Sequence, residues 1–445
     1  MQTKREQKQT RMMLLPPLEA YIPKDYPIRR LNKVLDLSFI HEAVREHYCQ
    51  DNGRPSIDPE VIIRLFLLQA IEGITHVREL LRQVQVNLAY RWFIGYDLDE
   101  KLPDHSSLSR ALDRFGDKVF NELFARSIAQ CKASKLIEGK ILHLDATTIR
   151  ADIDRDRVNT PDSPDPDARY GHFPGGRVLP GYKQQTIADQ KSRVIVGIDV
   201  VPADNYEGQD TVAMVDQAVE HLGKSPQAVC ADSAYASGAN MAALGERGIR
   251  LVSPPPKPIT YTKDRYFTVE DFKYDEHKDI FTCPAGETLS NSGAVKARPG
   301  KYLYRCSKRS CKNCSLKSRC TDAPYRQLKV GKNHGALIRL RADSKTESFR
   351  QIYRARAPVI EGIFAESKCW HGLGRAWRRG LVKMRIQSLL IAAAINLKRL
   401  ICLFILRFNE NSIVIRLLTQ YGLIINSLSE KLSKQSKDEL FLTEV

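Results

Sequence analysis

The chain has 445 residues, a hydrophobic content of 42% and a formal net charge of +17 at pH 7. This length allows two or three domains, and the apolar content is sufficient for a sizeable buried core. The basic balance argues against a neutral or basic small molecule as partner and favours a polyanion such as nucleic acid, with a merely solvated basic surface as the alternative.

The first long segment, residues 35–136, shows helical periodicity almost throughout. Asp58, Pro59 and Glu60 offer an N-cap, a proline at the first helical position and an acid in the first turn. Thr75 is a candidate cap for the next helix. The pattern predicts an all-α unit of several short helices, compatible with a helix-turn-helix arrangement.

Strand-like runs replace the helical period after Gly139. Residues 141–145 form one predicted strand, and two further runs form a predicted hairpin. The stretch 155–180, rich in Pro, Gly and Asp, is most simply a loop. Such a series, continued by alternating helices and strands, predicts an α/β domain around a central sheet. The hairpin is expected over 182–188 and 194–201, and the later elements over 211–222, 227–231, 241–247 and 250–253.

The last third of the chain is more varied. Residues 257–332 are polar and turn-rich, and from residue 346 helical periodicity returns and runs to Phe408. The longest uncharged run, 386–397, is shorter than the roughly 20 residues that cross a bilayer, so we expect a buried helix and no membrane partner. A further apolar segment lies near 413–428. The charged N-terminus lacks an export signal, so we expect a reducing, cytoplasmic location.

Three acidic residues have the settings that a metal site requires. Asp145 and Asp232 each close a short apolar run, so a buried strand delivers each carboxylate to an edge. Glu361 lies in a predicted helix with Lys368 two turns later on nearly the same face. Two divalent cations roughly 4 Å apart need such hard oxygen ligands to promote an in-line phosphoryl transfer. Strand-capping aspartates are the plainer interpretation, and Asp199, also in an apolar strand, is the closest rival.

Five cysteines share the segment 257–332, and two of them form a Cys-x2-Cys pair. Thiolates in a reducing compartment suit tetrahedral zinc, but five candidates compete for four places. An iron–sulfur cluster and reduced, unligated thiols are the alternatives. The candidates are Cys283, Cys306, Cys311, Cys314 and Cys320.

A basic run begins at Arg375 and continues through Arg378 and Arg379 around Trp377. Guanidinium forks beside an aromatic plane suit phosphate contact and base stacking. A solvated basic face is the alternative.

The segment from Tyr353 to Lys368 has the pattern Tyr-x2-Arg-x4-Glu-x6-Lys, and the sequence Asn-Leu-Lys-Arg follows at 396–399. This pattern resembles the C-terminal catalytic region of bacterial insertion-sequence transposases of the DDE class, and within that class the IS1182-like group. Other blocks agree with the resemblance in order, so that it covers residues 17–400: 59–73, 87–95, 103–109, 145–147, 181–183, 231–235 and 283–286. Pro358 is a departure, because the helix must start or kink there.

The resemblance implies an α/β fold with a ribonuclease H-like catalytic core, an all-α N-terminal domain and a cysteine-rich insertion. It also implies that Asp145, Asp232 and Glu361 are the catalytic residues and bind Mg²⁺ or Mn²⁺. Zn²⁺ is an additional candidate for four of the five cysteines. The residues expected to contact DNA are Tyr353, Arg356, Lys368, Arg375, Arg378 and Arg379.

Four parts of the chain are therefore predicted: an N-terminal DNA-binding domain at 17–136, a catalytic domain at 139–256 and 346–408, the cysteine-rich insertion at 257–332, and a C-terminal helix and tail at 409–445. The predicted function is Mg-dependent cleavage at the ends of an insertion sequence and strand transfer into target DNA, by a homodimer or higher assembly. The alternatives are a non-catalytic DNA-binding regulator and a stand-alone metal-dependent nuclease.

Overall fold

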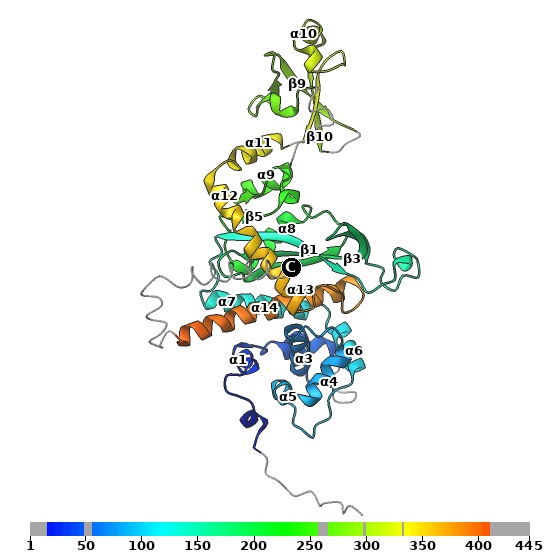
Figure 1. Cartoon of the computed structure of the whole chain (residues 1–445), viewed down its shortest axis with the longest axis vertical. Coiled ribbons are helices and arrows are strands. Elements are labelled where there is room, and N and C mark those ends of the chain that lie inside the picture. Colours follow the sequence, from blue (N-terminus) through cyan, green and yellow to red (C-terminus); the bar gives the residue numbers. More distant parts are fainter. Residues whose placement is uncertain (1–15, 49–55, 257–265, 297–299, 332, 410–445) are drawn as a thin grey trace, which may run out of the picture.

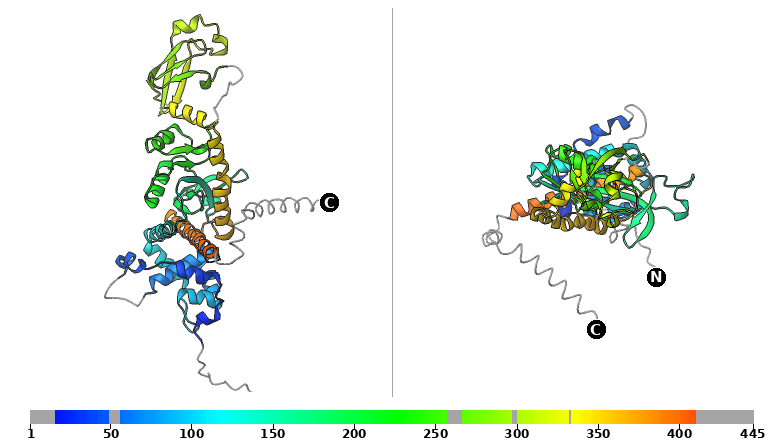
Figure 2. Two further views of the ribbon diagram at one scale, coloured as in Figure 1. Left: turned by 90° about the vertical axis from the view of Figure 1, so that its left-hand side faces the viewer. Right: turned by 90° about the horizontal axis from the view of Figure 1, so that it is seen from above.

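The computed structural model describes residues 16–48, 56–256, 266–296, 300–331 and 333–409. These residues form three parts that follow one another along the long axis of the molecule (Figures 1 and 2). A group of helices from the N-terminal region lies at one end, a mixed sheet with its helices lies in the middle, and a small antiparallel sheet lies at the other end.

The N-terminal region is helical, as its periodicity predicts. The Asp58 carboxylate accepts a hydrogen bond from the Glu60 backbone N–H at 2.8 Å and caps the third helix, as expected. The expected cap at Thr75 is wrong, because the next helix begins at Val77 and its N-cap residue, His76, makes no side-chain capping bond. The elements are η1 (Leu18–Tyr21), α1 (Pro27–Val34), α2 (Ile40–Ala43), η2 (Arg45–His47), α3 (Pro59–Ile71), α4 (Val77–Val86), α5 (Leu88–Ile94), α6 (His105–Phe115) and α7 (Lys118–Ala133).

The central sheet has six strands, of which β1 is the middle one. On one side of β1, β3 pairs with β1 in antiparallel orientation and β4 pairs with β3 in antiparallel orientation. On the other side of β1, β5 pairs with β1 and β6 pairs with β5, and both run parallel to β1. The strands are β1 (Ile141–Arg150), β2 (Arg169–Phe173), β3 (Arg177–Asp189), β4 (Ile195–Pro202), β5 (Ala228–Cys230) and β6 (Arg250–Val252). The accompanying helical elements are η3 (Arg155–Arg157), α8 (Thr211–Leu222), η4 (Ser233–Tyr235) and α9 (Gly238–Glu246).

Two features of this sheet differ from the sequence-based expectation. Strand β1 continues five residues beyond Asp145 to Arg150, because its later residues still pair with β3. The stretch 155–180 is not only loop: β2 and the start of β3 form a hairpin there. Gly175 and Gly176 both have positive φ in the turn of this hairpin, which explains why a glycine-rich sequence is compatible with strands.

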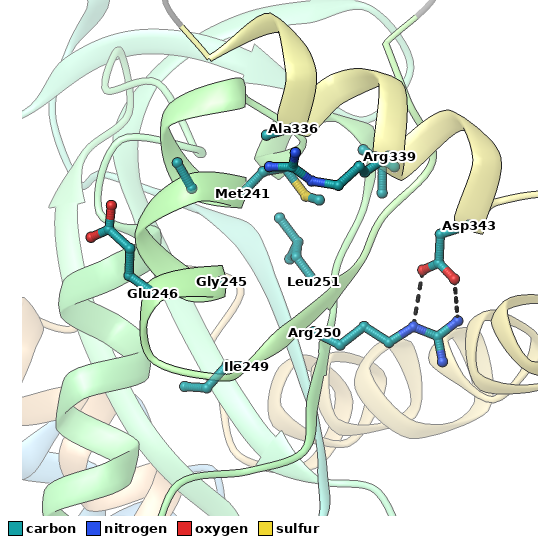
Figure 3. A pocket seen from close by; sticks show the side chains of 11 residues that line it. Met241, Gly245, Glu246, Ile249, Arg250, Leu251, Ala336, Arg339 and Asp343 are labelled. Carbon is teal, nitrogen blue, oxygen red and sulfur yellow. Dashed lines mark hydrogen bonds and ion pairs between the residues drawn. The ribbon is translucent and has the colours of Figure 1, made fainter. Parts of the chain in front are cut away.

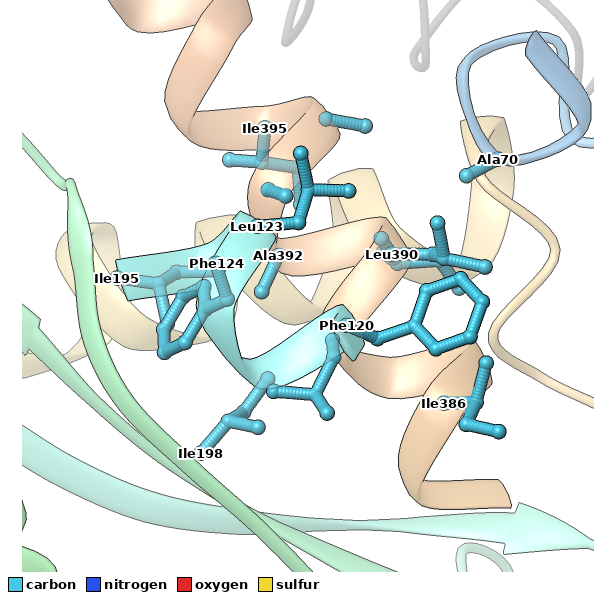
Figure 4. Packing of buried hydrophobic residues seen from close by; sticks show 14 of the residues in the cluster. Ala70, Phe120, Leu123, Phe124, Ile195, Ile198, Ile386, Leu390, Ala392 and Ile395 are labelled. Atoms are coloured by element: carbon cyan, nitrogen blue, oxygen red, sulfur yellow. The ribbon is translucent and has the colours of Figure 1, made fainter. Parts of the chain in front are cut away.

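One long helix, α14 (Leu381–Asn409), joins the helical region to the sheet. Its apolar side chains, including Leu390, pack with Phe120 of α7 and Ile195 of β4 (Figure 4). The Asn396 side chain accepts a hydrogen bond from the Ile195 N–H at 2.8 Å and donates one to the Ile195 carbonyl at 2.9 Å. Residues 381–403 are long and apolar enough to cross a membrane, but 72% of the tested window is buried inside the protein, as expected for a core helix.

The cysteine-bearing segment forms a five-stranded antiparallel sheet with its own small core around Phe281 and Leu289. Sequence periodicity gave no indication of this sheet, whose longest strand has seven residues. Its elements are η5 (Val269–Asp271), β7 (Lys273–Asp275), β8 (Ile280–Thr282), β9 (Thr288–Ala294), β10 (Lys301–Cys306), α10 (Lys308–Lys312), η6 (Lys317–Arg319) and β11 (Gln327–Gly331).

The chain returns from this sheet to the centre of the molecule through α11 (His334–Asp343), α12 (Glu347–Arg354), the π-helical turn η7 (Ala357–Glu361) and α13 (Gly362–Trp370). The N-terminal helices and the central sheet share one continuous hydrophobic core, so the predicted domain boundaries remain predictions. The predicted C-terminal helix around 413–428 lies outside the described residues.

Candidate active site

Asp145 lies on β1, and Asp232 follows the neighbouring strand β5 at a matching position. The last paired residues of β1 and β5 are His143 and Cys230, and each aspartate comes two residues later. Because β5 ends at Cys230, the part of β1 that carries Asp145 is no longer covered by that strand and contacts η7 instead. The parallel register therefore brings Asp145, in the middle of β1, and Asp232, just after β5, to the same level of the sheet; the expectation that Asp145 closes its strand is wrong, because β1 continues to Arg150.

The π-helical turn brings Arg356 and Glu361 to the same site. Nη2 of Arg356 donates a hydrogen bond to Oδ2 of Asp145 at 2.6 Å, and its Nη1 lies 3.5 Å from Oε1 of Glu361. In an α-helix, residues five apart point in different directions, but the wider π turn keeps them on one side. Pro358 lies within this turn, so the chain neither starts a new helix nor breaks there but widens locally.

The electrostatic environment of Asp145 is mixed. Burial raises the pKa of the Asp145 carboxyl to about 6, while the Arg356 guanidinium and the Ala146 N–H act in the opposite direction. The charges of Asp232 and Glu207 raise this pKa further. The Asp145 side chain is only 12% exposed, whereas that of Glu361 is 60% exposed. The site therefore carries an excess of negative charge, which the positive charge of a cation would reduce.

Two residues of this environment were not selected from the sequence. Glu207 contributes to the negative field at Asp145 and pairs with Lys183 at 3.2 Å. The Tyr235 hydroxyl is buried without a hydrogen-bond partner in the described part of the chain, and burial raises its pKa well above the usual value, with further contributions from Asp145, Glu207 and Asp232. The sequence signal that could have identified Tyr235 is its position three residues after Asp232. No signal distinguished Glu207 from the other acidic residues of its region.

The other residues predicted to contact DNA have different settings. Tyr353 stacks on Phe349 with ring centroids 6.1 Å apart, and burial lowers the pKa of Lys368. Arg375 and Arg379 are exposed and both pair with Asp152.

Arg378 differs from these neighbours because its guanidinium carbon lies 5.1 Å from the centre of the Phe66 ring. Burial lowers the pKa of Arg378 to about 10. None of the predicted DNA contacts except Arg356 touches Asp145 through a hydrogen bond or ion pair among the described residues.

The carboxylates suit a divalent metal in their chemistry, though not in their present arrangement. Among the residues that the structure describes, no three His, Cys, Asp or Glu side chains are grouped to hold a metal ion. Asp145 and Asp232 supply the hard oxygen atoms that Mg²⁺ or Mn²⁺ prefers, but the Arg356 guanidinium takes the place of a cation on Asp145 and Glu361. The cation that faces Asp145 and Glu361 in this arrangement is therefore the Arg356 guanidinium.

The five cysteines of the small sheet are brought together around one hollow of about 20 Å³. Cys306 and Cys311 are buried, and burial together with Cys311 raises the pKa of the Cys306 thiol to about 12. The Cys283 sulfur accepts a hydrogen bond from the Glu287 N–H at 3.3 Å. In the described part of the chain these thiols, like the carboxylates, are not spaced closely enough to form a group that could hold a metal ion.

One large hollow lies away from the carboxylates. It has a volume of about 690 Å³ and lies between α9, β6 and α11 (Figure 3). Arg250 and Asp343 close one side through a hydrogen-bonded ion pair, with N–O distances of 2.9 and 2.6 Å. Its lining includes none of the predicted site residues.

Two segments of the chain match known families. A model described as a transposase domain (DUF772) matches residues 16–114, and a model described as a transposase DDE domain matches residues 282–401. The chain is an enzyme of the DDE transposase type. The second match includes Glu361, whereas Asp145 and Asp232 lie outside both matched segments.

Solved structures that are similar to this transposase include the piggyBac transposase in a synaptic complex with hairpin DNA, at 11% identity over 92% of this chain and 85% of that one, with a TM-score of 0.35. They also include the Mos1 transposase in a paired-end complex with the left transposon end, at 11% identity over 72% and 80% of the two chains, with a TM-score of 0.19. These TM-scores are too low to support an argument. No curated protein matches the chain.

Proposed function

We propose that this transposase performs metal-dependent cleavage at the ends of an insertion sequence and joins the freed ends to target DNA, with Asp145, Asp232 and Glu361 as the metal ligands. The observation that carries the proposal is the matched position of Asp145 and Asp232, each two residues beyond the last pair between β1 and β5. Glu361 adds a third carboxylate that is linked to Asp145 through Arg356.

The strand order supports a ribonuclease H-like core. Three antiparallel strands, β4, β3 and β1, are followed in the sheet by the parallel strands β5 and β6. This order places a carboxylate in the middle of the central strand and another directly after its parallel neighbour, and a helix that follows an inserted segment supplies the third. The finer assignment to the IS1182-like group rests on the Tyr-x2-Arg-x4-Glu-x6-Lys pattern.

The chain's residues prepare the site for this chemistry. Asp145, Asp232 and Glu361 would hold Mg²⁺ or Mn²⁺, which when bound stabilises the attacking and leaving oxygens of an in-line displacement. Burial of Asp145 excludes water from its carboxylate and strengthens its attraction for a cation. Arg356, once released from Asp145, provides a planar guanidinium beside the site that can bind a DNA phosphate. Lys368 follows Glu361 by two turns and supplies a second positive charge.

DNA is the proposed partner, at both the element ends and the target, and pairing of two ends requires at least a dimer. The proposed location is the cytoplasm.

For the five-cysteine hollow we propose zinc held by four of the five thiols, because a small enclosed space lined by thiols suits one tetrahedral ion.

The deciding experiment is strand cleavage of a plasmid that carries the gene's own flanking sequences, in Mg²⁺ or Mn²⁺. We expect cuts at the flank boundaries for the wild type and none for Asp145→Asn. Asp199→Asn is the matched control, because Asp199 is also a strand aspartate but pairs with Arg385 at 3.1 Å. Equal cleavage by Asp145→Asn and the wild type would exclude the proposed ligand. Cleavage without joining would instead indicate a nuclease.

A further inference from the structure

A second hollow lies where the two family-matched segments meet. Its volume is about 680 Å³, and it lies between the start of α4, the start of α6 and the loop before α14. We call it the α4–α6 groove. It is lined by Thr75, His76, Val77, Arg78, Glu79, Arg82, His105, Ser109, Trp377 and Arg378. Three arginines against one glutamate make it positively charged, and none of its lining residues is a proposed metal ligand.

Arg378 enters this groove as a cation that the protein does not neutralise. Nη2 of Arg378 is buried and has no hydrogen-bond partner among the described residues, and its guanidinium lies over the Phe66 ring. The nearest influence of opposite sign is Asp113, which is already paired with Lys383 at 2.9 Å. A buried charge without a carboxylate partner is costly, so an anion in the groove would stabilise the Arg378 guanidinium by electrostatic attraction.

Arg78 provides a second uncompensated charge. Its Nη2 lies 3.2 Å from Nε2 of His105. The other ring nitrogen of His105, Nδ1, lies 3.4 Å from Asp104. Arg78 therefore contacts an imidazole nitrogen rather than a carboxylate, and among the described residues it makes no ion pair with a carboxylate. Arg82, by contrast, is held by Glu79 through two hydrogen bonds of 2.8 Å.

We infer that the α4–α6 groove binds the phosphate backbone of DNA, with Arg78 and Arg378 as its principal phosphate contacts. This inference rests on the proposed function for its choice of DNA as the polyanion. The guanidinium groups offer the planar forks that phosphates prefer, and the groove is much larger than a single phosphate ion requires. The Trp377 indole N–H donates a hydrogen bond to the Gly372 carbonyl at 3.1 Å, and this bond holds the ring in the wall of the groove.

The test compares DNA binding by full-length Arg78→Glu, Arg78→Ala and wild-type protein, measured by fluorescence anisotropy of duplexes that carry the gene's flanks, over a series of salt concentrations. Arg78 is exposed, so its replacement leaves the fold intact, which circular dichroism verifies. We expect Arg78→Glu to weaken binding about tenfold and to reduce the salt dependence by about one phosphate contact. Arg45→Glu is the matched control, because Arg45 is an exposed arginine of the same region that does not line the groove.

Three results would overturn the inference: unchanged DNA affinity in Arg78→Glu, an equal loss in Arg45→Glu, or a loss confined to the binding of inorganic pyrophosphate, which would indicate a small-anion site. The result is separable from the catalytic proposal. If the wild type binds DNA through Arg78 but never cuts it, the groove stands and the catalytic proposal fails. If Asp145→Asn abolishes cleavage while Arg78→Glu binds DNA normally, the catalytic proposal stands and the groove inference fails.

Discussion

Arg356 forms a bridge between Asp145 and Glu361, two of the three proposed metal ligands. One guanidinium nitrogen lies 2.6 Å from Oδ2 of Asp145 and the other lies 3.5 Å from Oε1 of Glu361. The Arg356 side chain is only 14% exposed, so this cation is held within the site rather than on the surface. If Asp145 binds a divalent metal, as we propose, the metal and Arg356 would compete for the same carboxylate.

Replacement of Arg356 by alanine should raise the affinity of the DNA-free protein for Mn²⁺. The competing guanidinium is removed while the carboxylates remain, so we expect about tenfold tighter binding, equivalent to about 1.4 kcal/mol. Electron paramagnetic resonance of free Mn²⁺ at pH 8 measures this directly, without DNA or turnover. Arg375→Ala is the control, because Arg375 pairs with Asp152 instead. Weaker or unchanged Mn²⁺ binding in Arg356→Ala would show that no competition exists.

The pH dependence of Mn²⁺ binding should report the state of Asp145. Its pKa is raised to about 6, so the carboxyl is neutral at lower pH and a proton competes with the metal. We expect affinity to rise between about pH 5 and pH 7 and then to level off. Since Arg356 lowers this pKa, Arg356→Ala should move the midpoint to higher pH. A titration of Mn²⁺ affinity against pH tests both statements, and a midpoint that stays in place in Arg356→Ala would contradict the second.

Local signals in the sequence predicted much of the scaffold. The cap at Asp58 and the hairpin of β3 and β4 depend on neighbouring residues, and both are confirmed. The apolar run before Asp232 correctly placed that residue just after a strand, whereas the run before Asp145 did not show that β1 continues to Arg150. Strand β2 could not be anticipated, since a glycine- and proline-rich stretch carries no alternating pattern and its pairing depends on β3.

The interactions that define the candidate site were not available from local signals. Arg356 and Asp145 are separated by 211 positions, so no periodicity relates them. Pro358 indicated a start or a kink, and only the packed structure shows that the backbone widens into a π turn. The position of Arg378 in the α4–α6 groove could not be predicted either, because a basic run in a sequence does not show which of its arginines packs over Phe66.

Zinc content gives a direct test of the cysteine hollow. We expect roughly one zinc per chain in the purified full-length protein, measured by plasma mass spectrometry, and its loss in Cys311→Ser. Cys369→Ser is the control, because Cys369 is exposed and does not line the hollow. Because burial keeps the Cys306 pKa near 12, zinc binding should also release protons. Protein without zinc whose thiols all react with a thiol reagent would support reduced, unligated cysteines.

Glu366 should stabilise the protein in a pH-dependent manner, because it ties α13 to α14. Its carboxylate accepts a hydrogen bond from Lys398 at 2.8 Å and pairs with Arg399. Burial alone would raise the pKa of Glu366, but the nearby His371 ring, whose Nε2 lies 3.9 Å from Oε1, the hydrogen bond from Lys398 and the charge of Arg399 hold it well below its ordinary value. A depressed carboxyl pKa means that the stabilisation is complete above the ordinary value of 4.5 and is lost as the pH falls below it.

Replacement by glutamine removes the charge without changing the shape. We expect Glu366→Gln to lower the free energy of unfolding by roughly 2 kcal/mol at pH 7, with a smaller loss below pH 4.5, measured by urea denaturation at both pH values. Glu347→Gln is the control: its ion pair with Arg350 is 3.6 Å long and exposed, so its loss should cost less than about 1 kcal/mol. Because Glu366 lies on α13 between Glu361 and Lys368, a loss of stability that does not depend on pH would mean that packing, rather than the charge, holds this helix against α14.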